Sequence, residues 1–205
     1  FLGDSHTKDL FNSFYLNKKF YPQYDFSTIR YLLNLNLSYL LERKDFQSAK
    51  YIVLTYRLEE ENFENFEKLI NFLLAHNKKI IISSRKNEYL SDFKLRYKNH
   101  WLINLTLADK FFLENNLKFI TSDNEIQNLN KIYYFNKVNV EIIQNINKKL
   151  KDLTLKYNLL FFNQNEYQCE DNKEFCHGIT PSGKKIFYDY GHYTIDGSKF
   201  FGEQI

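Results

Sequence analysis

Two short stretches at opposite ends of the chain carry residues suited to acyl-transfer chemistry. Near the start, Gly3-Asp4-Ser5-His6 follows two apolar residues and precedes a helix-like pattern. A sharp strand-to-helix turn of this kind presents a serine hydroxyl at the edge of a parallel sheet. Near the end, Asp189 precedes His192 by three positions. At that spacing a carboxylate can accept a hydrogen bond from one imidazole nitrogen and leave the other for a substrate or nucleophile.

A serine hydroxyl is a poor nucleophile at neutral pH unless a base lies within hydrogen-bond reach and is itself oriented. Neither stretch is specific alone, because Gly-Asp-Ser and Asp-x-x-His each occur often by chance. Here one follows the first predicted strand and the other precedes the last predicted helix. We therefore expect the two ends of the chain to meet and form one hydrolase-type site.

The composition fits a single folded α/β domain over residues 1–205. Of its 205 residues 43% are apolar and 18% aromatic, which argues against disorder. The net charge is only +3, and basic residues are scattered among acidic ones, so no nucleic-acid partner is expected. No apolar run approaches the ~20 residues that cross a bilayer.

Apolar patterning supplies the elements that must position these residues. Apolar runs predict strands at residues 1–3, 51–54, 80–82 and 159–162. Helical spacing predicts helices over residues 6–16, from Ser27 to Leu41, and over 61–75, 139–157 and 195–205. Between 87 and 131 the pattern is weaker, and we expect short helices at 90–97 and 107–116.

Alternating strands and helices predict a three-layer α/β/α sandwich with a parallel, flavodoxin-like sheet. Sites in such sheets form beyond the carboxyl ends of the strands. Ser5, Arg57 and Arg85 each follow a predicted strand. All three should therefore lie along the same edge of the sheet.

These blocks resemble those of the SGNH (GDSL-like) hydrolases. Gly3-Asp4-Ser5-His6 is similar to their first block, and the segment from Asp189 to His192, continuing to Phe201, is similar to their last. The resemblance is closest to SGNH domains fused behind membrane acyltransferases of the O-antigen acetylase type. In these domains a strand also ends in small or aromatic residues and an arginine, as residues 53–57 do here. It implies the SGNH hydrolase fold, with Ser5 as nucleophile, His192 as general base and Asp189 as its orienter.

The chain departs from the standard SGNH pattern at the oxyanion hole. It has no Gly between Gly3 and Gly178, so the second-block Gly is absent, and Thr55-Tyr56-Arg57-Leu58 replaces the third-block Gly-x-Asn-Asp. The Ser5 backbone N–H is the donor that carries over. We expect Arg57 to supply another, because its guanidinium is a permanent donor. The alternative is a surface arginine paired with one of the acids at 59–61.

The remaining candidates have structural explanations beside functional ones. Cys169 and Cys176 fit a local disulfide in an oxidising compartment, or two free thiols in a reducing one; the acyltransferase-fused branch has a cysteine pair at this place. With His177 they lack a fourth metal ligand nearby, so no metal or cofactor is expected. His6 should be a supporting or substrate-contacting residue, and Asp4 should brace the turn or cap the helix.

The sequence thus predicts a serine-dependent O-acyltransferase or esterase that acts on O-acyl groups, O-acetyl above all, of a bacterial surface carbohydrate. The substrate-binding residues are not identifiable. The chain begins inside its first predicted strand and without Met. We therefore expect a periplasmic domain attached in cis to an upstream membrane acyltransferase domain. The alternatives are a free-standing carbohydrate or lipid esterase and a non-catalytic carbohydrate-binding module.

Overall fold

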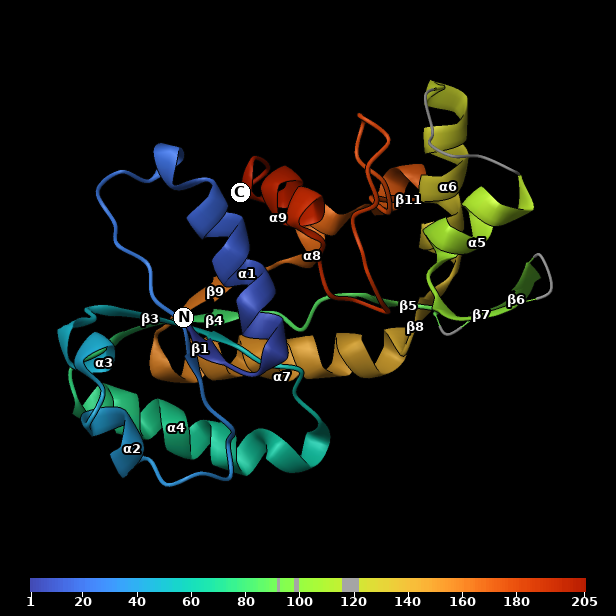
Figure 1. Ribbon diagram of the computed structural model, residues 1–205. Coiled ribbons are helices and arrows are strands. Elements are labelled where there is room, and N and C mark those ends of the chain that lie inside the picture. Colours follow the sequence, from blue (N-terminus) through green and yellow to red (C-terminus); the bar gives the residue numbers. More distant parts are fainter. Residues whose placement is uncertain (92, 98–99, 116–121) are drawn as a thin grey trace. The chain divides into compact units, whose positions relative to one another are not determined.

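The computed structural model describes residues 1–91, 93–97, 100–115 and 122–205 (Figure 1). They form two compact units, each built from several segments of the chain. The first unit comprises Phe1–Phe11, Tyr21–Arg85 and Glu141–Gln164, and the second Asn12–Phe20, Lys86–Val140 and Asn165–Ile205. That the whole chain acts as one SGNH-type domain stays a prediction.

A five-stranded sheet forms the centre of the first unit, in the order β2-β1-β3-β4-β9. Every neighbouring pair in it is parallel. Its strands are β1 (Leu2–Gly3), β2 (Ile29–Arg30), β3 (Tyr51–Thr55), β4 (Lys79–Ser83) and β9 (Leu160–Phe162). The predicted parallel sheet is therefore confirmed, and the predicted strand positions agree closely with β1, β3, β4 and β9.

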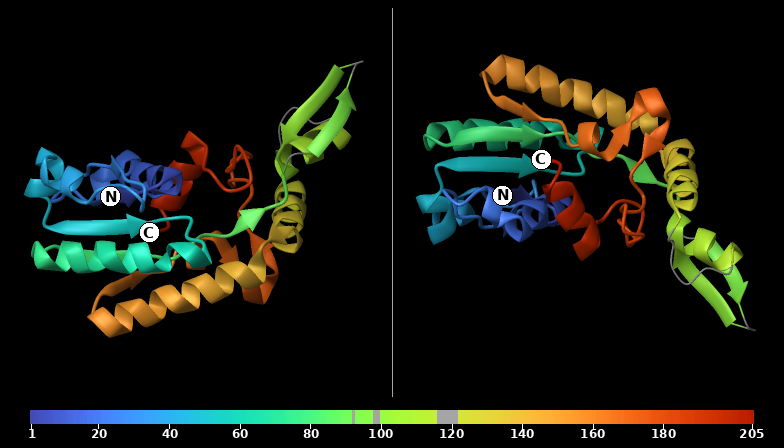
Figure 2. Two further views of the ribbon diagram at one scale, coloured as in Figure 1. Left: turned by 90° about the horizontal axis from the view of Figure 1, so that it is seen from below. Right: turned by 90° about the horizontal axis from the view of Figure 1, so that it is seen from above.

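Helices cover both faces of this sheet. The first turns of α1 lie on one face, and α4 and α7 lie side by side on the other (Figures 1 and 2). The helices that begin or lie in this unit are α1 (Ser5–Leu16), α2 (Ser38–Leu41), α3 (Lys44–Ser48), the 3-10 turn η2 (Glu60–Asn62), α4 (Phe63–Ala75) and α7 (Val140–Tyr157). None of the helices in the described ranges is long and apolar enough to span a bilayer.

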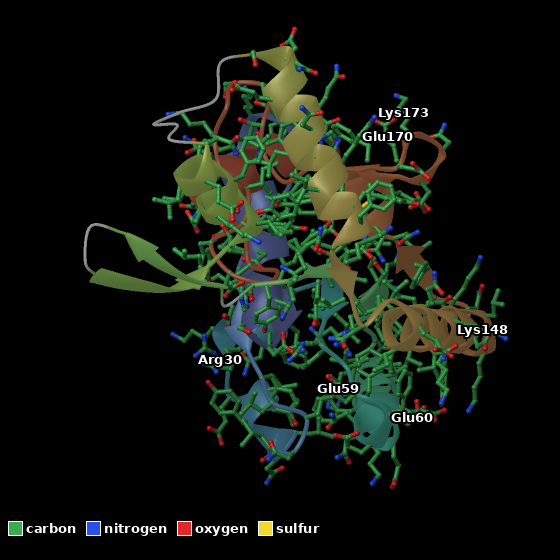
Figure 3. The ribbon with its side chains drawn as sticks, turned by 90° about the vertical axis from the view of Figure 1, so that its right-hand side faces the viewer. Arg30, Glu59, Glu60, Lys148, Glu170 and Lys173 are labelled. Carbon is green, nitrogen blue, oxygen red and sulfur yellow. A yellow bond between two sulfur atoms is a disulfide. The ribbon has the colours of Figure 1, made fainter. Side chains whose placement is uncertain are left out.

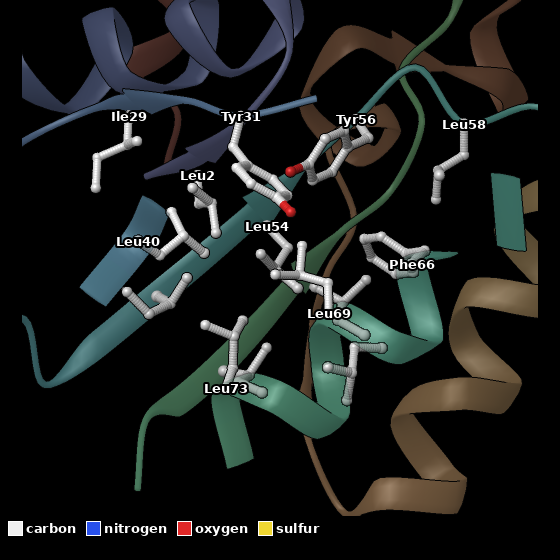
Figure 4. Packing of buried hydrophobic residues seen from close by; sticks show 14 of the residues in the cluster. Leu2, Ile29, Tyr31, Leu40, Leu54, Tyr56, Leu58, Phe66, Leu69 and Leu73 are labelled. Carbon is white, nitrogen blue, oxygen red and sulfur yellow. The ribbon is translucent and has the colours of Figure 1, made fainter. Parts of the chain in front are cut away.

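The apolar core of the first unit fixes where β1 ends. Leu2 and Leu54 extend from the sheet toward Phe66, Leu69 and Leu73 of α4 (Figure 4). Each of these five side chains is at most 1% exposed. Because full burial of such a side chain contributes about 1.5–3 kcal/mol, this packing holds β1 and β3 firmly against α4.

Gly3, at the end of β1, is surrounded too closely for any side chain. A Cβ added there would lie 1.9 Å from the carbonyl oxygen of Thr55 and 2.0 Å from Oγ1 of Thr7. Those two groups are themselves joined by a 2.6 Å hydrogen bond from the Thr7 hydroxyl to the Thr55 carbonyl. The start of α1 is thereby held directly against β3.

Gly3→Ala should destabilise the protein by about 1–3 kcal/mol, because the added methyl group must displace backbone of β3. Urea unfolding followed by circular dichroism measures the change. Lys8→Ala, at an exposed position of α1, is the control and should leave the midpoint almost unchanged. An equally stable Gly3→Ala variant would contradict the close approach of these segments.

The second unit combines short strand pairs with helices and has its own aromatic core. Tyr89 and Phe187 pack with ring centroids 4.8 Å apart, and Phe201 and Tyr193 with the same separation. The strands are β5 (Glu88–Tyr89) paired with β8 (Lys137–Val138), β6 (Phe93–Tyr97) with β7 (His100–Leu105), and β10 (Cys169–Glu170) with β11 (Phe175–Cys176), all antiparallel. The helices and 3-10 turns are η1 (Lys18–Phe20), α5 (Leu107–Glu114), α6 (Asp123–Phe135), α8 (Asn165–Gln168), η3 (Asp171–Lys173) and α9 (Ile195–Gly202).

Two predicted helices are wrong, and one is partly outside the described residues. Between Ser27 and Leu41 the chain instead enters β2, where Ile29 pairs with Leu2, and becomes helical only in α2. Residues 93–97 of the predicted helix 90–97 form β6, paired with β7. The helix predicted at 107–116 is α5, which ends at Glu114, and position 116 lies outside the described residues.

Candidate active site

The predicted nucleophile stands at the junction of a strand and a helix. Ser5 is exposed and is the first residue of α1, directly after β1 and Asp4. The Asp4 carboxylate accepts the His6 N–H at 2.9 Å through Oδ1 and the Arg57 N–H at 2.7 Å through Oδ2. Asp4 thus caps α1 and braces the turn to the segment after β3, as predicted. The Ser5 N–H lies at the positive end of the α1 dipole, where a developing oxyanion would be stabilised.

The predicted edge of the sheet is present in the first unit. Ser5, Arg57 and Arg85 follow the parallel strands β1, β3 and β4, so all three lie beyond carboxyl ends. Arg85 is buried, and its guanidinium donates to the Leu58 carbonyl at 2.7 Å and pairs with Glu59 at 3.1 Å. Arg85 therefore stabilises the loop after β3. Arg57, the other arginine beyond this edge of the sheet, is half-buried.

Asp189 and His192 lie on a tight turn of the second unit. The residues that flank the turn, Phe187 and Tyr193, form an antiparallel bridge. Inside it the Tyr188 N–H donates to the His192 carbonyl at 3.0 Å. Two backbone groups of the turn, the N–H of Gly191 and of His192, donate to Asp189 Oδ1 at 2.9 and 2.7 Å. An aspartate that accepts from the backbone two residues ahead is typical of such turns.

The second oxygen of Asp189 holds the imidazole. Oδ2 lies 2.8 Å from Nδ1 of His192. Partial burial opposes ionisation of Asp189, but the hydrogen bonds from the His192 ring and from the two backbone N–H groups outweigh it and lower the pKa to about 2. The carboxylate therefore stays charged at neutral pH, and the stability it gives is lost only as the pH falls toward 2. A charged carboxylate at Nδ1 keeps the proton there, so Nε2 has the form a general base requires.

Two tyrosines flank the His192 ring. Tyr188 stacks on the imidazole at 5.6 Å between ring centroids and 17° between planes, and Tyr190 meets it edge-on at 5.5 Å. The Tyr188 ring is 53% exposed. We therefore take Tyr188 as a candidate substrate contact. The one signal for this residue in the sequence is its position beside Asp189.

The segment after the turn anchors it to α9. Thr194 caps α9, because its Oγ1 accepts the Gly197 N–H at 3.0 Å, and the same hydroxyl donates to the Lys185 carbonyl at 2.6 Å. A Cβ on Gly197 would lie 2.4 Å from the Ile186 carbonyl oxygen. These last-block residues thus have a structural role, which is to hold both arms of the turn together.

Cys169 and Cys176 form a disulfide, as the local-bridge prediction expected. They are directly opposite each other in the β10–β11 pair. Glu170 and Lys173, labelled in Figure 3, form a 2.6 Å ion pair in the same hairpin. His177 packs its ring against Phe200 at 5.0 Å, and burial lowers its pKa. Both sulfurs form the disulfide, so Cys169 and Cys176 have a structural role, which is to link β10 to β11.

Reduction of the disulfide should lower the free energy of unfolding by about 2–3 kcal/mol, the loop-entropy value for so short a loop. Thermal unfolding with and without a phosphine reductant measures the loss as a lower Tm. A variant with both cysteines replaced by serine should match the reduced wild type and ignore the reductant. Two free thiols in non-reducing denaturant would contradict the bridge.

The structure brings Asp189 and His192 together and places Ser5 at the expected edge of the first unit's sheet. The serine and the Asp–His pair thus belong to different units, and their joint action is part of the function proposed below. His6 is buried in α1, next to Ser5 in sequence. His76 follows the last residue of α4 and packs its ring against Phe72 of that helix, so its role there is structural.

The arrangement of the sheet and of the helices has counterparts among solved structures. No family model matches the chain, and no curated protein matches it in sequence. Among solved structures, the periplasmic domain of a lipopolysaccharide acetyltransferase from Salmonella serovar Paratyphi A is similar. It aligns with a TM-score of 0.69 and 16% identity, over 100% of this chain and 80% of that one.

Two further structures come from Bacteroides. A proposed acylhydrolase from Bacteroides fragilis aligns with a TM-score of 0.52 and 13% identity, over 98% of this chain and 81% of the other. A GDSL-like lipase from Bacteroides thetaiotaomicron aligns with a TM-score of 0.48 and 13% identity, over 100% and 82% of the two chains. At such identities the likeness is one of fold, and the first two structures confirm the predicted three-layer α/β/α fold with a parallel sheet.

Proposed function

We propose that this protein is a serine-dependent O-acyltransferase or esterase whose triad is Ser5, His192 and Asp189. The 2.8 Å contact between Asp189 Oδ2 and His192 Nδ1 is the observation that supports it most strongly, because it orients an imidazole as a base. Support also comes from the exposed Ser5 at the start of α1. The fold is shared with an acetyltransferase domain and a proposed acylhydrolase, which is consistent with either acyl transfer or ester hydrolysis.

The reaction would follow two acyl-transfer steps. Ser5 Oγ attacks the carbonyl carbon of the acyl donor while His192 Nε2 takes its proton, and Asp189 stabilises the imidazolium. The tetrahedral intermediate then collapses, His192 protonates the leaving group, and an acyl-Ser5 ester remains. A sugar hydroxyl or water, deprotonated by His192, attacks this ester and releases Ser5 together with the acylated sugar or the free acid.

Transfer to a surface carbohydrate is the form of this activity that we favour. The lipopolysaccharide acetyltransferase domain is a fold neighbour, and it is periplasmic. A disulfide in this chain suits an oxidising, extracytoplasmic compartment. We propose that an upstream membrane acyltransferase domain delivers the acyl group, with acetyl as the favoured one. Simple hydrolysis is the second candidate, favoured by the acylhydrolase neighbour.

Turnover of p-nitrophenyl acetate with a panel of methyl glycosides tests this function. We expect p-nitrophenol release by the wild type and, in the presence of a suitable glycoside, an acetylated sugar detectable by mass spectrometry. Acetate alone with every glycoside would favour the hydrolase. Absence of p-nitrophenol release above the Ser5→Ala background would contradict both and favour a non-catalytic carbohydrate-binding module.

Arg57→Ala should lower kcat by about 10²–10³-fold if the guanidinium is the second oxyanion donor. Arg57→Lys should recover part of the loss, because an ammonium donates from the same side without the planar fork. Arg43→Ala is the matched control, because this arginine lies just before α3 and pairs with Asp45 at 3.1 Å. A change below threefold in kcat for Arg57→Ala would remove Arg57 from the oxyanion hole.

A further inference from the structure

The Asp189–His192 turn is held from outside by two other segments of the second unit. On one side, the Tyr89 N–H donates to the Tyr190 carbonyl at 2.8 Å. On the other, Gln168 Nε2 donates to the hydroxyl of Tyr193, the residue directly after His192. The turn is therefore fixed on both sides of Gly191 by partners distant in sequence.

Gln168 is in turn fixed at each end of its amide. The side chain is fully buried, at 0% exposed. Its Oε1 accepts the Asn87 N–H at 3.1 Å, and its backbone carbonyl accepts the His177 N–H at 2.9 Å. It directly precedes Cys169, whose sulfur also accepts a 3.4 Å contact from Asn87 Nδ2. Because both amide ends are used, the donor end is directed at Tyr193.

Tyr193 is anchored by its ring as well as by its hydroxyl. It is 4% exposed, and its ring packs on Phe187 at 5.6 Å and Phe201 at 4.8 Å. The ammonium of Lys86, itself 2% exposed, lies 4.2 Å from the ring centroid. A buried cation over an aromatic face is attracted to it, which adds a further restraint on Tyr193.

We propose that Gln168 and Tyr193 are positioning residues for His192. The bond between Gln168 Nε2 and the Tyr193 hydroxyl would fix the position of the backbone after His192. In that position the hydrogen bond between His192 Nδ1 and Asp189 is maintained. Both residues would act through His192 without touching substrate. Because a displacement of about 1 Å of a catalytic group can cost 10²-fold in rate, a single buried hydrogen bond here matters for catalysis. This role presupposes the function proposed above.

Tyr193→Phe tests the role because it removes the hydroxyl and keeps the ring for Lys86, Phe187 and Phe201. We expect kcat for p-nitrophenyl acetate to fall about 10–100-fold with KM almost unchanged. In proton NMR, the low-field signal of His192 Nδ1–H should shift or broaden. Tyr157→Phe is the matched control, since it removes a tyrosine hydroxyl that donates to Glu67 at 2.6 Å in the other unit. It should change neither readout.

A double-mutant cycle separates positioning from general destabilisation. Gln168→Leu should lower kcat at least as much as Tyr193→Phe, since it also removes the acceptor of the Asn87 N–H. The double variant should lose little more than Gln168→Leu, because each single variant already breaks the bond between Gln168 and Tyr193. A lower Tm for Tyr193→Phe with wild-type kcat and an unchanged Nδ1–H signal would overturn the positioning role. A wild type without turnover would overturn the proposed function instead. The Nδ1–H signal of Tyr193→Phe then still decides the positioning role, and no change in it would overturn that role.

Discussion

Ser5→Ala and His192→Ala should each lower kcat by about 10⁶-fold, and the double variant should lose almost nothing more. Members of a triad act as a unit, because a base without its nucleophile, or a nucleophile without its base, contributes no turnover. The residual rate would come from the oxyanion donors and from substrate binding. Of the variants considered, these should have the largest effect on activity. Ser5→Ala should hardly affect folding, since Ser5 is exposed, whereas His192 is buried and His192→Ala also removes the contact with Asp189.

Steady-state turnover of p-nitrophenyl acetate by the purified variants measures these effects, with circular dichroism to verify that each is folded. His76→Ala is a suitable control, because it removes an exposed imidazole at the end of α4. Losses that simply multiply in the double variant would mean that Ser5 and His192 act independently. That result would contradict a shared triad.

Asp189→Asn should lower kcat by about 10³–10⁴-fold. A neutral amide retains the shape of the side chain but can present its NH₂ group to Nδ1 of His192, which then favours the tautomer with its proton on Nε2. The substitution also removes the charge that the low pKa of about 2 maintains. It therefore removes both the orientation of the base and the stabilisation of the imidazolium.

A matched variant separates this effect from loss of surface charge. Asp196→Asn changes the same side chain in the first turn of α9, at an exposed position, and should retain wild-type kcat. The kinetics of each variant are followed from pH 5 to about 9, a range that brackets most histidine titrations. Activity of Asp189→Asn within tenfold of the wild type would show that another group orients His192.

The strands β1, β3, β4 and β9 of the first unit were predictable because their signal is local. The Ile80-Ile81-Ile82 run has the composition of a central parallel strand, and β4 is buried there. The Asp189–His192 pair was predictable for the same reason, because three positions of a tight turn determine the contact. The helix predicted over 139–157 is α7, which ends at Tyr157, and the next residue, Asn158, has a φ of 52°.

The two wrong helices have different causes, and the first cause is non-local. The leucines after Ser27 recur at helical spacing, yet Leu32 and Leu41 of that pattern are 43% and 39% exposed. Ile29 is instead buried by pairing with Leu2, a partner far away in sequence. Within β6 the pattern Phe93-Lys94-Leu95-Arg96-Tyr97 alternates with a period of two, which indicates a strand and was available in the sequence.

The residues that hold Tyr193, and through it His192, could not be predicted from the sequence, because their contacts join segments that are distant in sequence. Gln168 and Lys86 have no motif, and they meet Tyr193 only because the chain folds three separate segments together. Burial of their polar groups becomes meaningful only once those partners are known. Functional residues without a local pattern need the fold before they can be named.

Mapping the adduct of a fluorophosphonate probe tests the central claim most directly. The probe forms a covalent bond with an activated serine, and mass spectrometry of the peptides identifies the modified residue. We predict an adduct on Ser5 in the wild type and none in Ser5→Ala. No adduct under conditions that label a control serine esterase, or an adduct that persists in Ser5→Ala, would contradict the assignment of Ser5 as the nucleophile.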